Sequence, residues 1–265
     1  MDIQNKKISL VLGSGGARGI TQIGVIQYLE EKGFEIDEIV GCSIGSLVGG
    51  AFACGQIYSL GDWMKKLTKA QVFRLMDFSN PRYGLLKGDR VLNTLHEVFA
   101  DTNIEALPLK YLAVATDLQH EEEVVFDSGS VYAAIRASMA IPGVFTAVKM
   151  DDRFLVDGGV LNPVPVNHVS KRNNLVVTVN LDGIFEKNGA DLSTLSSFSV
   201  LQESYFAMRR RLSRLTLELY KPDYVINIPR SIAGIWDYHR SSELIEIGYG
   251  MAENVMNGQR AHELS

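Results

Sequence analysis

The chain has 265 residues, of which 46% are hydrophobic, and we expect a single domain over residues 1–265 with one large core. Its 26 basic and 31 acidic residues give a formal net charge of −5, which argues against nucleic acid as the main partner. Cys42 and Cys54 are the only cysteines and both lie in apolar surroundings. We therefore expect reduced thiols in a cytoplasmic protein rather than a disulfide or a metal site.

A glycine-rich loop, Gly13-Ser14-Gly15-Gly16-Ala17-Arg18-Gly19, joins an expected strand, Ile8–Leu12, to an expected helix from about Ile20 to Glu31. The backbone N–H groups of such a turn point at one place at a helix N-terminus, so the loop favours bound negative charge. A dinucleotide pyrophosphate and the oxyanion of an acyl intermediate are the two competing ligands. The glycine spacing is one residue longer than the dinucleotide fingerprint and no P-loop motif is present, so the oxyanion is favoured.

The next expected strand, Ile36–Val40, ends in Gly41-Cys42-Ser43-Ile44-Gly45, and an apolar helical pattern follows. A Gly-Xaa-Ser-Xaa-Gly between a strand and a helix is typical of a nucleophile elbow, a strained turn that presents the serine hydroxyl at the helix N-terminus. We predict Ser43 as a nucleophile, with a simple N-cap as the alternative. The uncharged run 39–61 contains six glycines, which indicates a buried strand, elbow and helix rather than a membrane span.

A third turn, Asp157-Gly158-Gly159, ends the expected strand Phe154–Val156. Two glycines after a carboxylate remove side-chain bulk, so that another loop can approach the aspartate. A hairpin turn is the alternative for an isolated Asp-Gly pair. Together with a serine elbow and an oxyanion loop, the turn predicts Asp157 as the base, with a pKa raised by burial.

These blocks together resemble the bacterial branch of the patatin-like phospholipase family. The resemblance covers roughly residues 8–180 and includes Leu12–Gly19, Gly41–Gly45, Ala137-Ser138-Met139-Ala140-Ile141-Pro142-Gly143, Asp157–Gly159 and Asn162-Pro163-Val164-Pro165. It implies a three-layer α/β/α sandwich with a mostly parallel sheet, a Ser43–Asp157 dyad, hydrolysis of acyl esters of lipids, and no cofactor. Ser14 stands where many relatives carry glycine. Because an oxyanion donor needs only its N–H, we expect little damage from this departure.

In the expected mechanism, Asp157 takes the proton of Ser43 as the serine attacks the ester, and the Gly15 and Gly16 N–H groups hold the oxyanion. Arg18 either stabilises the loop through a salt bridge or binds a phosphate, and we expect the salt bridge. Two alternatives remain. One is a Ser-Asp-His triad that uses His168 or His239. The other is a lipid-binding module with little turnover on the same fold.

No sequence spacing typical of a metal site is present, and we expect Glu121-Glu122-Glu123 to be a solvated charge run rather than a ligand set. Catalysis is therefore expected to need no divalent ion.

Strand and helix patterns alternate through the rest of the chain. The expected strands are 111–116, 124–126, 154–156, 175–180 and 224–228, and the expected helices are 89–99, 131–138 and 164–171. This alternation predicts a mostly parallel sheet with both faces covered. Because sites in such sheets lie at the carboxyl ends of the strands, we expect the three functional turns to meet in one crevice.

Two segments interrupt the pattern, Phe73–Lys87 and Gly183–Ser197, and each is a candidate lid over the crevice or a plain surface loop. Beyond them an apolar stripe recurs in steps of four and three residues: Leu201, Tyr205, Met208, Leu212, Leu215 and Leu219. Arginines flank it at positions 209, 210, 211 and 214. We expect this helix to pack its stripe on the core. A subunit seam of a homo-oligomer and a peripheral contact with anionic headgroups at the inner membrane face are the alternatives.

Overall fold

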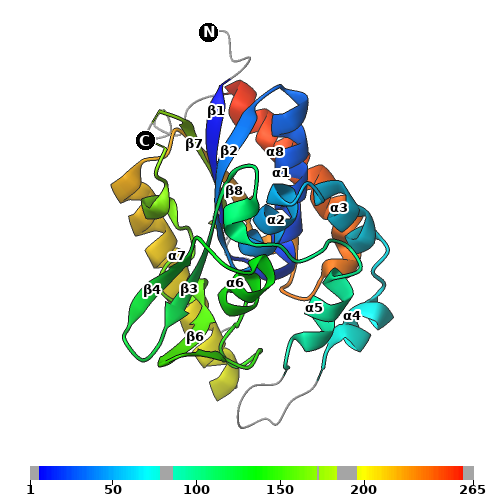
Figure 1. Cartoon of the computed structure of the whole chain (residues 1–265), viewed down its shortest axis with the longest axis vertical. Coiled ribbons are helices and arrows are strands. Elements are labelled where there is room, and N and C mark those ends of the chain that lie inside the picture. Colours follow the sequence, from blue (N-terminus) through cyan, green and yellow to red (C-terminus); the bar gives the residue numbers. More distant parts are fainter. Residues whose placement is uncertain (1–5, 78–85, 172, 184–195, 259–265) are drawn as a thin grey trace.

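A mixed eight-stranded sheet lies at the centre of the computed structural model, which describes residues 6–77, 86–171, 173–183 and 196–258 (Figure 1). The strands are β1 (Lys7–Leu12), β2 (Glu35–Cys42), β3 (Lys110–Asp117), β4 (Glu122–Phe126), β5 (Val148–Met150), β6 (Arg153–Asp157), β7 (Leu175–Gly183) and β8 (Tyr224–Pro229). Their order is β5-β6-β3-β2-β1-β7-β8, and β4 pairs with β3. The five strands from β3 to β8 along this order are parallel to one another, which confirms the predicted mostly parallel sheet.

The antiparallel strand β6 lies in line with β2. One edge of β3 pairs with β4 over Ala113–Asp117, so the other edge must hold both β2, opposite residues 110–114, and β6, opposite residues 115–117. Since β2 is parallel to β3 and β6 is antiparallel to it, their carboxyl ends meet head to head. Asp157 therefore follows the carboxyl end of its strand, as expected, but it reaches the same place from the opposite direction.

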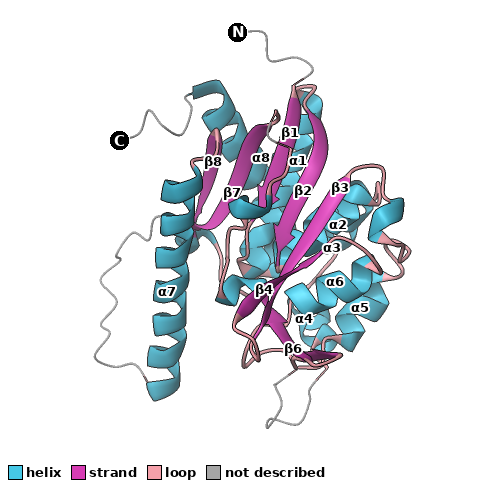
Figure 2. Cartoon of the chain, turned by 60° about the vertical axis from the view of Figure 1, so that its left-hand side comes forward, coloured by secondary structure: helices cyan, strands magenta, loops and turns pink. Residues whose placement is uncertain are grey.

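Helices cover both faces of the sheet, as the fold class predicts (Figure 2). They are α1 (Thr21–Glu31), α2 (Ile44–Ala53), α3 (Ile57–Lys65), α4 (Lys69–Leu75), α5 (Asp89–Leu95), α6 (Val131–Ser138), α7 (Ser197–Tyr220) and α8 (Ser241–Gly258). The main core lies between the sheet and α1, α2, α6 and α8. A smaller core on the opposite face includes Val164 and Val166 and touches Leu217 of α7.

Strand β1 shows why both faces need cover. Successive side chains of a strand point to opposite faces. Ile8, Leu10 and Leu12 accordingly belong to the main core, and Val11 belongs to the smaller one. All four are fully buried, so this strand lies inside three layers.

Two expectations for helices need correction. Only a 3₁₀ turn, Val166–His168, forms within 164–171, because the backbone turns extended at Val169 and the Ser170 and Lys171 N–H groups donate to the Glu38 carboxylate instead of to a helix. The apolar stripe of α7 points mainly to solvent: Leu201, Met208, Leu215 and Leu219 are 69%, 61%, 43% and 70% exposed. The inner side of α7 instead buries Phe206, Arg209 and Ser213.

Some elements of the fold were not predicted, and two predicted segments fall largely outside the described residues. Helices α3, α4 and α8 and strand β5 were not expected from the sequence. Most of the two candidate lids, residues 78–85 and 184–195, lies outside the described residues.

Candidate active site

Ser43 sits at the junction of β2 and α2 in a backbone conformation that few side chains adopt, with φ 56° and ψ −125°. The turn is tight on both sides. A Cβ atom at Gly41 would lie 2.6 Å from the carbonyl oxygen of Gly45, and one at Gly45 would overlap the carbonyl oxygen of Leu12. Both glycines of the elbow are therefore required by close backbone approach.

A serine that we did not single out from the sequence fixes this turn. The Ser43 N–H donates to Ser138 Oγ at 2.8 Å, and Ser138 Oγ donates to the Val114 carbonyl at 2.6 Å. Ser138 thereby ties the elbow to β3 and to the end of α6. Its only sequence signal is its place in the Ala137–Gly143 block.

Asp157, at the end of β6, meets Ser43 side chain to side chain. Ser43 Oγ donates to Asp157 Oδ2, and the Gly159 N–H donates to Oδ1 at 2.7 Å. Both side chains are buried, each residue being only 1% exposed. Burial raises the pKa of Asp157 above the ordinary range, while the Ser43 hydrogen bond, the charge of Arg209 and the Gly159 amide act in the opposite direction.

The two glycines after Asp157 have separate steric reasons. A Cβ atom at Gly158 would overlap the Val114 carbonyl and lie 3.0 Å from Cys42 Sγ. A Cβ atom at Gly159 would lie 2.8 Å from Ser14 Oγ and 2.9 Å from Asp157 Oδ1. Ser14 is thus in contact with the site through its side chain, and its hydroxyl lies 3.5 Å from Asp157 Oδ1.

No histidine in the described ranges is hydrogen-bonded to Ser43 or Asp157. His168 Nε2 lies 2.6 Å from Glu123 Oε2, and His120 Nδ1 lies 2.6 Å from Asp117 Oδ2. This geometry argues against His168 as the base of a triad. It also corrects the expectation for one member of the acidic run: Glu121 and Glu122 are exposed, but Glu123 is half-buried and accepts a hydrogen bond from Asn162.

The glycine-rich loop lies against both other turns. The Gly13 N–H donates to Val179 at 3.0 Å, and the Ser14 N–H donates to the Pro163 carbonyl at 2.9 Å, which gives the Asn-Pro element a structural role. The second half of the loop forms a 3₁₀ turn, Gly16–Ile20, which leads into α1. Gly19 packs directly on Ile44, the residue after the nucleophile candidate, with no space for a Cβ atom. The structure therefore brings all three turns together.

Arg18 is buried beneath this loop. Its Nε donates to the Gly15 carbonyl at 3.1 Å, and its Nη2 lies 3.9 Å from Asp182 Oδ1. Burial lowers the pKa of Arg18 to about 10, although the charge of Asp182 opposes the shift. Since only 1% of the residue is exposed, this position suits the expected loop brace rather than contact with a substrate phosphate.

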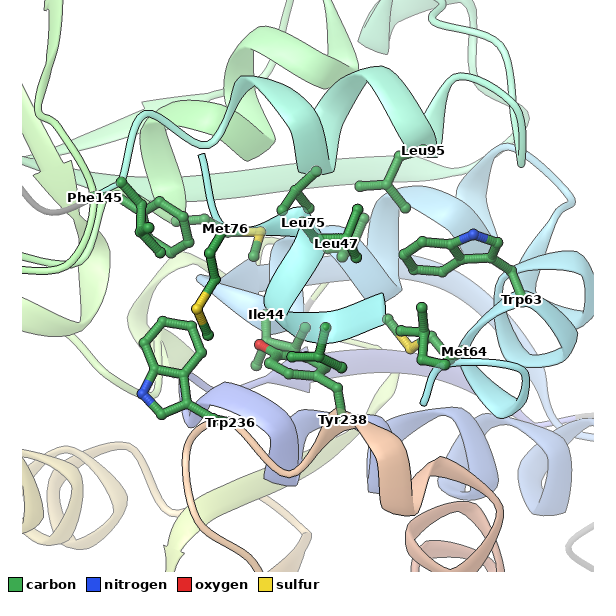
Figure 3. A pocket seen from close by; sticks show the side chains of 15 residues that line it. Ile44, Leu47, Trp63, Met64, Leu75, Met76, Leu95, Phe145, Trp236 and Tyr238 are labelled. Carbon is green, nitrogen blue, oxygen red and sulfur yellow. The ribbon is translucent and has the colours of Figure 1, made fainter. Parts of the chain in front are cut away.

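An apolar cavity opens beside the elbow, with about 610 Å³ of empty space including its mouth. Ile44, which follows Ser43, and Met139, which follows Ser138, are part of its wall. Figure 3 shows Trp63 and Met64 of α3, Leu75 of α4 and Leu95 of α5 around the same space. Its lining is almost wholly apolar, which suits a hydrocarbon chain.

Within the ranges described above, no group of three or more His, Cys, Asp or Glu side chains is arranged to hold a metal ion. None of the helices in those ranges has the length and apolar character needed to span a membrane.

The sequence matches one family model and several known proteins. The model of the family described as patatin-like phospholipase matches residues 10–169. An uncharacterized NTE family protein of Mycobacterium bovis is 30% identical over 94% of this chain and 91% of its own length. Lysophospholipase NTE1 of Candida albicans is 32% identical over 75% of this chain but only 15% of its own length. The structure of VipD from Legionella pneumophila aligns with a TM-score of 0.44 and 14% identity, covering 92% of this chain and 67% of that one.

The chain belongs to the patatin-like phospholipase family. It is a lipid ester hydrolase.

Proposed function

We propose that the protein is a serine acyl hydrolase of the phospholipase A or lysophospholipase type, with Ser43 as nucleophile and Asp157 as base. The observation that carries the proposal is the hydrogen bond from Ser43 Oγ to the buried carboxylate of Asp157. The name of the Candida relative favours lysophospholipids among the substrates.

The reaction follows from these positions. Asp157 accepts the hydroxyl proton as Ser43 Oγ attacks the ester carbonyl, and the N–H groups of Gly15 and Gly16 stabilise the oxyanion. The proton then passes to the leaving alcohol, which leaves an acyl-enzyme. Water, deprotonated by Asp157, attacks this ester, and the proton returns to Ser43 as the fatty acid departs. A raised pKa makes Asp157 a stronger base than an exposed aspartate.

We assign the fatty-acyl chain to the apolar cavity beside Ile44. Each buried CH₂ group contributes about 0.8 kcal/mol to binding, so such a wall favours long acyl chains over short ones. No cofactor or metal enters this mechanism, and a cytoplasmic location stays a prediction based on the two unpaired cysteines.

The dyad is tested by the acylation rates of Ser43→Ala, Asp157→Asn and the double variant on one short-chain ester. A general base contributes roughly 10² to 10⁴-fold, and residues that act as one unit give non-additive losses. Both single variants should therefore lose at least about 100-fold, and the double variant should be little worse. The exposed residues Ser59 and Asp62 provide matched controls as Ser59→Ala and Asp62→Asn.

Near-normal acylation in folded Asp157→Asn would refute the dyad. An equal loss in His239→Ala would instead favour a triad. A low-turnover lipid-binding module is the outcome if a fluorophosphonate probe leaves Ser43 of the folded wild type unlabelled.

We further propose that the outer stripe of α7 (Leu201, Met208, Leu215 and Leu219) contacts an anionic lipid surface. Arg211, Arg214 and Lys221 are exposed beside it, against the single exposed carboxylate of Glu218 on this flank. A helix with an apolar stripe and a basic flank binds at the headgroup boundary of anionic bilayers. A second copy of the chain fits less well, because antiparallel pairing of two stripes centres near residue 210 and brings the two Arg211 side chains together.

Cosedimentation with phosphatidylglycerol or phosphatidylcholine vesicles tests this surface. Replacing Met208 and Leu215 together by Gln should weaken binding to the anionic vesicles by at least about tenfold, since burial of each side chain contributes about 1.5 to 3 kcal/mol. Leu118→Gln alters an exposed leucine outside the stripe and should bind like wild type. Unchanged vesicle binding would contradict the proposal, and conversion of a wild-type dimer to a monomer would identify a subunit seam.

A further inference from the structure

On helix α7, the side chain of Arg209 points inward and contacts the glycine-rich loop. Arg209 is 5% exposed, although its neighbours on this surface helix are the exposed Met208 and the half-buried Arg210. Its Nη2 donates to the Ser14 carbonyl at 2.8 Å and to Asp182 Oδ2 at 2.9 Å. Arg209 lies outside residues 10–169, the part that the family model matches.

The carbonyl that Arg209 holds belongs to the peptide whose N–H is that of Gly15. In a trans peptide the C=O and N–H bonds point in opposite directions. Holding the Ser14 carbonyl on the α7 side therefore directs the Gly15 N–H to the other side of the loop. Arg18 does the same one residue later, because its bond to the Gly15 carbonyl fixes the orientation of the Gly16 N–H.

We propose that Arg209, held by Asp182, is a positioning residue that orients the oxyanion donors of this enzyme. The inference rests on the proposed function, in which the Gly15 and Gly16 amides stabilise the oxyanion. It adds a contribution from α7 to a site otherwise built from three turns.

The charges suit this role. Asp182 lies between the two buried guanidinium groups, 3.9 Å from Arg18 and 2.9 Å from Arg209. Burial acts to lower the pKa of Arg209, but the charges of Asp182, Tyr205 and Asp157 together raise it above the ordinary value, so Arg209 stays cationic. Both contacts come from Nη2, at the far end of the arginine side chain. A lysine at this position would keep the charge, but its side chain is one bond shorter, so its ammonium would not reach both the carbonyl and the carboxylate.

The same cation acts on the base. Burial raises the pKa of Asp157, and the charge of Arg209 limits that rise. Removing the charge at position 209 should therefore move the rising limb of the pH profile of kcat/KM to higher pH. A residue that only supported the fold would not shift this limb.

The test compares Arg209→Met, Arg209→Lys and the control Arg74→Met, which removes an exposed arginine of α4. Steady-state hydrolysis of a short-chain p-nitrophenyl ester gives kcat, KM and the pH profile, and thermal melts check folding. Loss of an oxyanion donor costs about 10² to 10³ in kcat. We expect kcat of Arg209→Met to fall about 100-fold, with KM changed less than about threefold and the rising limb at higher pH.

In Arg209→Lys the rising limb of the pH profile should stay at its wild-type position, because the charge remains. Its kcat should fall about tenfold, because one contact is lost. Arg74→Met should match wild type. A folded Arg209→Met with wild-type kcat, or one that changes only KM, overturns the inference. If Arg209→Met does not fold, wild-type kcat in Arg209→Lys overturns it. If the wild-type protein has no esterase activity, the proposed function itself is refuted. This result differs from the outcomes above, which concern only the role of Arg209.

Discussion

At the residue scale, Asp157 combines two opposed requirements. A base that removes a serine proton benefits from burial, because an exposed aspartate has a pKa near 3.9 and holds a proton too weakly. Yet an ionised carboxylate away from water destabilises the folded state unless it accepts hydrogen bonds. The hydrogen bonds from Ser43 and Gly159 stabilise this buried charge in part, but the pKa of Asp157 still lies above its ordinary value.

This balance predicts a gain in stability when the charge is removed. Because the folded-state pKa of Asp157 lies above the unfolded value, the folded state binds more protons between the two values, and the free energy of unfolding falls as pH rises through the folded-state pKa. Asp157→Asn should therefore melt higher than wild type at pH 7, by about 2 to 4 °C for about 1 kcal/mol. The difference should shrink toward about pH 4, near the ordinary aspartate pKa.

Calorimetry at both pH values measures this effect. Asp62→Asn, at an exposed position on α3, should leave Tm unchanged. A lower Tm for Asp157→Asn at pH 7 would mean that the carboxylate's hydrogen bonds outweigh its desolvation, contrary to the prediction.

At the element scale, the site depends on two strands that end against each other. The sequence patterns predicted β2 and β6 and the turn after each of them. They did not predict the antiparallel direction of β6, because periodicity within a strand carries no information about the direction of its neighbour. The direction follows from the pairing of Asp117 with Leu155 across the sheet, a contact between segments far apart in sequence.

Gly158 is the point where the two strand ends touch, and it gives a direct prediction. A methyl group there would meet the Val114 carbonyl and Cys42 Sγ, so Gly158→Ala must push the Asp157 turn away from the elbow. We expect kcat to fall at least about 100-fold, the cost of roughly 1 Å of misplacement, in a protein that still folds.

Gly250→Ala is the matched control, since a Cβ atom at that position of α8 meets nothing within 4 Å. Its activity should equal that of wild type. Wild-type kcat in Gly158→Ala would show that the strand ends tolerate displacement and that Asp157 does not depend on this packing.

Helix α7 shows a second limit of sequence patterns. The steps of four and three residues correctly predicted a helix, because apolar periodicity reports helical geometry whichever way the stripe faces. The inner face could not be inferred, since it carries Arg209 and Ser213, residue types that are usually exposed. Their burial depends on Asp182, which belongs to another element.

At the scale of the whole molecule, the central sheet separates two kinds of surface. The apolar cavity lies among α2, α3, α4 and α5 on the side of the main core, whereas α7 covers the opposite face. Sequence motifs located the turns between them, because each motif is local and its glycines are required by short-range contacts. The cavity had no such signal. Its wall comes from side chains between Ile44 and Tyr238, which only the folded chain brings together.

The extent of the cavity predicts how hydrolysis depends on acyl-chain length. Met64 lies with Trp63 at the end of the cavity away from Phe145 and Trp236, and it is almost fully buried (Figure 3). Met64→Trp should fill that end and leave the elbow unchanged. If the acyl chain occupies this space, excluding three to four CH₂ groups removes about 3 kcal/mol of binding, so kcat/KM for a long-chain ester should fall about 100-fold.

A short-chain ester does not reach this end and should be hydrolysed at the wild-type rate, which separates a filled cavity from a damaged site. Tyr58→Trp places the same side chain at an exposed position of α3 and should alter neither substrate. Equal losses on both esters would indicate a distorted elbow. An unchanged preference for long chains in folded Met64→Trp would show that the acyl chain binds elsewhere, because a tryptophan at this position and a long chain cannot share the same volume.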